Sequence, residues 1–132
     1  MIKVVLDTNI LISSIFWFGM PKRIVDLAYQ QKIQNFTSFE ILAEMQAVLI
    51  EDFEVPLDRV KDILRDIMSY SLVIKSPAMK VKSLRDEQDA KIISCAVKAR
   101  VDYIVTGDKD LLVLGSFNGI KSINARDFIE KF

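Results

Sequence analysis

Short runs of aliphatic and β-branched residues alternate with longer segments of helical periodicity, and this alternation constrains the fold most strongly. The strand-like runs are residues 2–6, 33–36, 72–75, 103–106 and 120–123. The helical patterns cover residues 8–16, 21–31, 38–51, 57–71, 86–99, a short stretch ending at 114, and 125–132. Such alternation is typical of βαβ units, whose strands form parallel sheets. The sequence therefore predicts an α/β fold with a mainly parallel sheet of about five strands, in one domain over residues 1–132.

The composition favours a single globular domain without a membrane span or a disulfide framework. The chain has 132 residues, of which 51% are hydrophobic, and this is enough for a single domain with a sizeable core. It has no apolar run long enough to cross a bilayer and no signal peptide, and its single cysteine, Cys95, excludes an internal disulfide framework. We therefore expect a cytoplasmic protein. The net charge of zero neither indicates nor excludes nucleic-acid binding.

Two strand-like runs lead directly into an aspartate. Asp7 follows residues 2–6, and Asp108 follows residues 103–106 and Gly107. Ligands of parallel α/β sheets bind at the carboxyl ends of the strands, so we expect both carboxylates at one edge of the sheet. Asp7 could also simply cap the helix 8–16, and that remains the alternative explanation.

Other carboxylates could reach the same edge from helices. Glu44 lies at the border of the apolar stripe of its helix, where the alternative is a side chain that extends to solvent. Asp89 lies in the first turn of a helix that Asp86 would cap, and the helix dipole alone favours acidic residues there. Asp110 either joins the site or caps the next helix.

The chain contains no histidine. This excludes histidine-based zinc sites, Ser-His-Asp triads and histidine general bases. Carboxylates gathered at close range repel each other unless a cation lies among them, and a cation held mainly by oxygen is typically Mg²⁺ or Mn²⁺. We therefore predict a Mg²⁺ or Mn²⁺ site at the acidic edge of the sheet.

The ordered set of motifs resembles the PIN-domain nucleases, and most closely the prokaryotic toxin components related to VapC. The motifs are Val5-Leu6-Asp7-Thr8-Asn9, Glu44, Arg85-Asp86-Glu87-Gln88-Asp89 and the run from Tyr103 to Leu111. The resemblance covers essentially the whole chain. It implies a three-layer α/β/α sandwich and a Mg²⁺- or Mn²⁺-dependent endoribonuclease. It also implies an RNA substrate, a homodimer and a small antitoxin protein as partner.

The resemblance also implies roles for individual residues. The four acidic positions of the family fall on Asp7, Glu44, Asp89 and Asp108, and we expect Asp7, Asp89 and Asp108 to be the direct metal ligands. We expect Glu44 to bind metal or to orient the attacking water. The supporting positions are Thr8, Asn9, Thr106 and Asp110. Arg85 and Lys109 are candidates for phosphate contacts, and the alternative is that both are merely exposed bases beside acids.

Two other classes of protein fit the sequence less well. A response-regulator receiver would need an aspartate after residues 72–75, and a haloacid-dehalogenase-type phosphatase would need one where Asn9 stands. A PIN-like domain that binds RNA or a partner protein without cutting remains open. The run Phe16-Trp17-Phe18 is expected to be core plus a dimer or partner surface, with nucleotide stacking as the alternative.

Overall fold

The computed structural model describes residues 1–76 and 87–132, with the side chains of residues 87 and 88 excepted. A six-stranded sheet runs through it in the order β3-β2-β1-β4-β6-β5. The strands are β1 (Ile2–Leu6), β2 (Ile33–Ser38), β3 (Ser71–Ile74), β4 (Tyr103–Val105), β5 (Ser116–Phe117) and β6 (Ile120–Ile123). All neighbours are parallel except β5 and β6. The mainly parallel sheet is therefore confirmed. The sixth strand, β5, has two residues, too few to show any alternation in the sequence.

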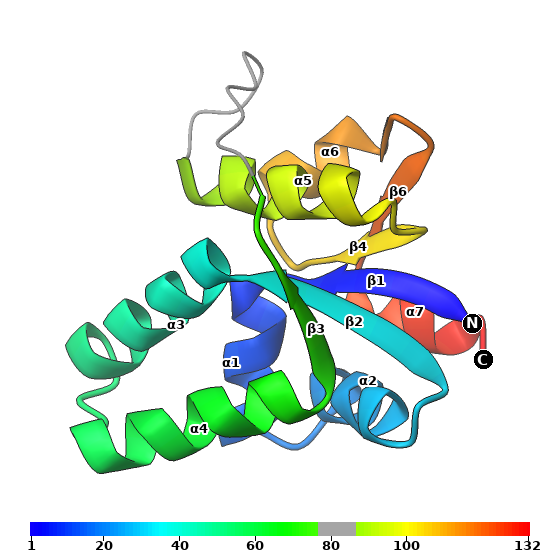
Figure 1. Cartoon of the computed structure of the whole chain (residues 1–132). Coiled ribbons are helices and arrows are strands. Elements are labelled where there is room, and N and C mark those ends of the chain that lie inside the picture. The colour runs from blue at the N-terminus through cyan, green and yellow to red at the C-terminus, as the bar shows by residue number, and fades with distance from the viewer. Residues whose placement is uncertain (77–86) are drawn as a thin grey trace.

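Helices cover both faces of this sheet (Figure 1). They are α1 (Thr8–Phe16), α2 (Met20–Tyr29), α3 (Phe39–Glu51), α4 (Leu57–Ser69), α5 (Glu87–Ala99), α6 (Lys109–Leu114) and α7 (Ala125–Glu130). Helices α5 and α6 lie on one side, and α1, α2, α4 and α7 lie on the other (Figure 1). The three-layer α/β/α sandwich is confirmed. Within residues 1–76 and 87–132, no helix combines the length and apolar character that a membrane span requires.

The apolar core is divided by the sheet into two parts. Side chains of β1 alternate between them, because successive residues of a strand point to opposite faces. Val4 and Leu6 pack with α1, α2, α4 and α7, whereas Val5 packs with residues of α5 and with Leu111 of α6. Both faces of β1 are thus buried, which explains why residues 2–6 are almost continuously apolar.

Short polar side chains cap the N-termini of helices α1, α3, α6 and α7. Asp7 accepts a hydrogen bond from the Thr8 N–H, and Ser38 accepts one from the Ile41 N–H. Asp108 and Asn124 act in the same way at α6 and α7. Each cap satisfies a backbone N–H that the helix itself leaves without a partner. The expected cap Asp86 lies outside the described residues.

Strands β1 and β4 are neighbours in the sheet although nearly a hundred residues separate them, and Leu6 pairs with Val105. From β1 the chain builds β2 and β3 toward one edge, and after α5 it returns to build β4 and β6 on the other side. The boundary between β1 and β4 is therefore a topological switch point, where α/β sheets form their ligand sites. Asp7 and Thr106 follow these two strands at this boundary.

Asn35 of β2 supports β1 close to this boundary. Its side chain is fully buried, and its Oδ1 accepts a 3.0 Å hydrogen bond from the Leu6 N–H. Its Nδ2 donates a 2.8 Å hydrogen bond to Ser71 Oγ of β3. The last paired residue of β1 along β2 is Val4, so the Asn35 amide replaces the backbone partner that Leu6 would otherwise lack.

Candidate active site

A cavity of about 320 Å³ opens at the carboxyl edge of the sheet beside the switch point. Its lining includes Asp7, Glu44, Asp89 and Asp108. They come from four different places in the fold: the end of β1, the middle of α3, the first turn of α5 and the N-cap of α6. The structure thus brings together the four acidic residues that the sequence singles out, whereas their chemical roles remain predictions.

Asp7 is held in place by three hydrogen bonds to its carboxylate. Its Oδ1 accepts from the Thr8 N–H at 2.7 Å, so Asp7 does cap α1. Its Oδ2 accepts from Thr106 Oγ1 at 2.6 Å and from Asn9 Nδ2 at 3.2 Å. Capping and participation in the cavity are therefore compatible, because the two carboxylate oxygens have separate partners.

Burial raises the pKa of Asp7 above its ordinary value. The hydrogen bonds from Thr106, Thr8 and Asn9 counteract this effect, since they favour the charged form, and the nearby Asp108 carboxylate adds to the increase. The side chain is only 6% exposed. A cation bound beside Asp7 would therefore stabilise the charged form of its carboxylate.

Asn9 and Thr106 connect the ends of β1 and β4. Asn9 Oδ1 accepts a 3.1 Å hydrogen bond from the Gly107 N–H, and Thr106 Oγ1 accepts a 2.9 Å hydrogen bond from the Asp108 N–H. Thr106 is fully buried beneath the cavity rather than in its lining. These two of the four predicted supporting residues therefore link Asp7 to the turn that carries Asp108.

Glu44 and Asp89 are both buried, at 8% and 4% exposure. The alternative that Glu44 extends from its apolar stripe to solvent is therefore wrong. Helix α3 lies at the edge of the sandwich and contacts α1, α4 and α5, so the side of α3 that carries Glu44 faces the cavity. The sequence could place Glu44 at the border of the stripe, but the neighbours of that border depend on tertiary packing.

Asp110 lies close enough to Asp89 and Asp108 to be a metal ligand, whereas the family resemblance implies only a supporting role for it. Carboxylate oxygens of Asp89, Asp108 and Asp110 lie within 4.8 Å of one another, a spacing at which they could hold one ion. Asp108 is half-buried and Asp110 is exposed. Asp7 lines the same cavity but is not a member of this trio. The expected ligand set of Asp7, Asp89 and Asp108 thus differs from the trio by one residue.

The donor set fits a hard divalent cation. Carboxylate oxygens dominate it, and Mg²⁺ and Mn²⁺ prefer such ligands. The buried hydroxyl of Thr8 also lies at the cavity, and its oxygen has no hydrogen-bond partner among the described residues. A buried hydroxyl without a partner costs free energy, so this oxygen is suited to a metal-bound water or to the ion itself.

One of the two expected phosphate contacts is not part of this geometry. Lys109 is exposed at the start of α6, and the cavity lining does not include it. Arg85 lies outside the described residues. The apolar side of the cavity instead contains Ile12, Val48 and Phe53, of which Phe53 was missed by sequence reasoning. A single aromatic residue after a helix carries no signal that could have identified it.

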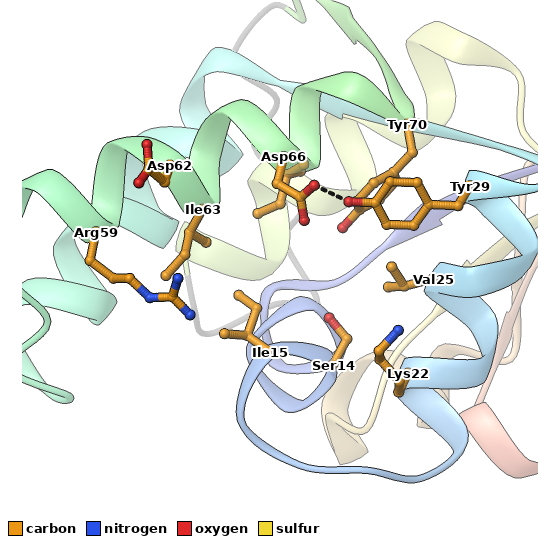
Figure 2. Close-up of a pocket in the computed structure, with 11 residues that line it drawn as sticks. Ser14, Ile15, Lys22, Val25, Tyr29, Arg59, Asp62, Ile63, Asp66 and Tyr70 are labelled. Carbon is orange, nitrogen blue, oxygen red and sulfur yellow. Dashed lines mark hydrogen bonds between the residues drawn. The ribbon is translucent and has the colours of Figure 1, made fainter.

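A second cavity, of about 290 Å³, lies between α1, α2 and α4 (Figure 2). Lys22 and Arg59 extend toward it from α2 and α4, while the Tyr29 hydroxyl donates a hydrogen bond to Asp66 Oδ1 (Figure 2). Lys22 pairs with Asp26 at 2.5 Å. Cations and anions balance locally in this cavity, so it lacks the excess of carboxylates that a divalent ion needs.

Comparisons with known proteins agree with this geometry. A family model described as PIN domain matches residues 3–110. The uncharacterized protein MJ1680 of Methanocaldococcus jannaschii is 35% identical over 144 aligned residues, which cover 99% of this chain and 92% of that protein. The crystal structure of PAE2754 from Pyrobaculum aerophilum has a TM-score of 0.65 at 16% identity, covering 98% of this chain and 94% of that one. This last similarity shows the fold alone.

Proposed function

This chain belongs to the PIN domain family, and from that premise we propose that it is a divalent-metal-dependent endoribonuclease. PIN domains are generally nucleases. The observation that carries the proposal is the convergence of Asp7, Glu44, Asp89 and Asp108 on one cavity at the switch point of the sheet. Carboxylates from four elements share this cavity. Their mutual repulsion destabilises the protein unless a cation lies among them, and a bound cation could serve the reaction.

The residues divide into ligands and residues that position them. Asp7, Asp89 and Asp108 would hold Mg²⁺ or Mn²⁺, and Asp110 joins them through its proximity to Asp89 and Asp108. When bound, such an ion lowers the pKa of its water and neutralises charge on the phosphate. Glu44 would orient the attacking water or add a further ligand.

Thr106 and Asn9 act by fixing Asp7. Their hydrogen bonds to Oδ2 select one orientation of the carboxylate, as outer partners of metal ligands do. Thr106 also binds the backbone N–H of Asp108, so one hydroxyl sets the relative positions of two acidic residues. Thr8 offers its hydroxyl to a bound water.

We further propose the biological setting that the VapC-like motifs imply. In it, residues 1–132 form one PIN-like domain that acts in the cytoplasm as the toxin component of a toxin–antitoxin pair. The chain pairs with a second copy and with a small antitoxin protein. The motifs at residues 5–9, 85–89 and 103–111 support this biological setting.

The test is a cleavage assay with matched variants. Purified protein is incubated with single-stranded RNA in Mn²⁺, in Mg²⁺ or in EDTA. We expect cleavage in either metal, none in EDTA, and a loss of at least about a hundredfold in Asp7→Asn and Glu44→Gln. Glu40→Gln is the control, because Glu40 lies one turn earlier on α3 but is exposed.

Two outcomes would contradict the proposal. Full activity of folded Asp7→Asn would show that the cavity is not the active site. Calorimetric Mn²⁺ binding without any cleavage would favour the alternative, a PIN-like domain that binds RNA or a partner protein. Growth arrest on expression of the wild type, relieved by Asp7→Asn, tests the toxin role separately.

A further inference from the structure

Three aromatic residues form an exposed cluster, the aromatic platform, made of Phe16, Trp17 and Phe53. The Phe16 and Phe53 rings stack with centroids 4.7 Å apart and planes at 10°. The Trp17 ring lies beside this pair, 5.8 Å from Phe16 and 6.3 Å from Phe53, at 71° to each. Trp17 is 57% exposed. Phe16 and Phe18 are exposed as well, so the expectation that the run 16–18 is partly core is wrong.

The aromatic platform is continuous with the acidic cavity. Phe53 belongs to both, because it lines the cavity and stacks on Phe16. Ile12 and Ser13 of α1 also line the cavity, and Phe16 and Trp17 follow them one helical turn later. Along α1, Phe16 lies only about 14 Å from Asp7. The cavity lining thus contains both carboxylates and one ring of the aromatic platform, that of Phe53.

The carboxylates and the adjoining aromatic rings suit two different parts of one polymer. Carboxylates with a divalent ion attract a phosphate, whereas exposed rings attract the flat face of a base. In double-stranded RNA the base faces are already stacked inside the helix, and only single-stranded bases can be placed against aromatic side chains. The rings of Phe16 and Phe53 already stack on each other before a base binds, which reduces the ordering that binding requires.

We propose that the aromatic platform is a base-stacking subsite for single-stranded RNA whose phosphate lies in the acidic cavity. The inference rests on the proposed function and adds to it a contact for a base of the bound strand. Continuity with the cavity favours RNA over a protein segment as the occupant. A base bound away from the reacting phosphate contributes equally to the ground state and the transition state, so the subsite affects KM rather than kcat.

Trp17 provides a direct test, because it is the only tryptophan of the chain. Single-stranded oligouridylate is titrated into the full-length protein in Ca²⁺ while tryptophan fluorescence is recorded. We expect saturable quenching. We expect none with an abasic oligomer that carries the same number of phosphates, and none with a blunt RNA duplex. Equal responses to oligouridylate and abasic oligomer would overturn the inference.

Variant kinetics provide the second test. Phe16→Leu and Phe53→Leu keep apolar bulk and remove the aromatic face. We expect each to raise KM for single-stranded RNA by about tenfold or more and to leave kcat nearly unchanged. Phe18→Leu is the control, because Phe18 is 97% exposed and lies outside the platform.

The outcomes separate this inference from the proposed function. Cleavage with an unchanged KM in both variants overturns the subsite and leaves the nuclease intact. Quenching by oligouridylate without cleavage supports the subsite and contradicts the nuclease. Fluorescence that responds to protein concentration but not to RNA assigns the platform to a contact between protein chains, and this too overturns the inference.

Discussion

Thr106 Oγ1 donates a 2.6 Å hydrogen bond to Oδ2 of Asp7, although the two residues are 99 positions apart in the sequence. The same hydroxyl accepts the Asp108 N–H at 2.9 Å. Because both bonds are formed by one buried oxygen, the end of β1 and the turn after β4 are held in a single arrangement. A buried hydroxyl beneath the cavity therefore sets the relative positions of Asp7 and Asp108.

The hydroxyl of Thr106 is expected to contribute to stability. Thr106→Val keeps the shape of the side chain but removes both hydrogen bonds, leaving a buried carboxylate oxygen with one partner fewer. We expect the free energy of unfolding to fall by about 2 kcal/mol, measured by urea denaturation. Thr106→Ser retains the hydroxyl and is expected to lose much less. Equal losses would show that the methyl group, and not the hydrogen bonds, matters.

The two roles of Asp108, as the N-cap of α6 and as a proposed metal ligand, can be tested separately. Asn caps a helix as well as Asp does, so Asp108→Asn is expected to leave α6 and the overall stability nearly unchanged. Its affinity for Mn²⁺, measured by calorimetry, is expected to fall by at least about tenfold. The control is Asp58→Asn, an exposed acidic residue in the first turn of α4. Similar Mn²⁺ affinity in both variants would exclude Asp108 as a ligand.

The raised pKa of Asp7 predicts a pH-dependent stability in the absence of metal. Between the ordinary value of 3.8 and the higher pKa of the folded state, the folded protein keeps a proton that the unfolded chain has lost. The Asp7 contribution to stability therefore falls as pH rises through this window.

The measurement is a set of thermal unfolding curves in EDTA from acid to neutral pH. The Tm of the wild type minus that of Asp7→Asn is expected to decrease with rising pH and then to level off. Addition of Mn²⁺ at neutral pH is expected to raise the Tm of the wild type more than that of the variant. A Tm difference that is constant across the pH series would contradict the assigned pKa direction.

Asn35 is expected to be a structural residue whose loss weakens the sheet next to the site. Asn35→Ala leaves the buried Leu6 N–H without its acceptor, at a cost of about 2 kcal/mol in urea denaturation. Ser71→Ala removes only the half-buried partner of the Asn35 amide and is expected to cost less. A larger effect of Ser71→Ala would refute this assignment.

Cys95 is expected to be unreactive in the folded protein. Burial, with a smaller contribution from the Glu40 carboxylate, raises the pKa of the Cys95 thiol to about 12. Thiolates are the reactive species, so labelling by a thiol-specific reagent near neutral pH should be at least about a hundredfold slower than in urea. Equally rapid labelling of folded and unfolded protein would show that the thiol is accessible.

Much of the fold could be predicted because its signals are local. Strands buried on both faces are almost continuously apolar, as residues 2–6 show, and helices carry a 3.6-residue periodicity. Caps such as Asp7 are recognised from a few neighbouring residues. The two-residue β5 escaped prediction because a strand of that length has no periodicity.

The order of residues along the chain is enough to show that carboxylates follow β1 and the β4 turn, and that no histidine is available to bind a metal. The other side chains that join these carboxylates are set by the folding of the whole chain. Glu44 is buried because α3 packs against its neighbours at the edge of the sandwich, and Phe53 lines the cavity because the chain after α3 returns toward α1. Spacing along the chain specifies the face of one helix. The residues opposite that face are set by long-range packing, which no local pattern encodes.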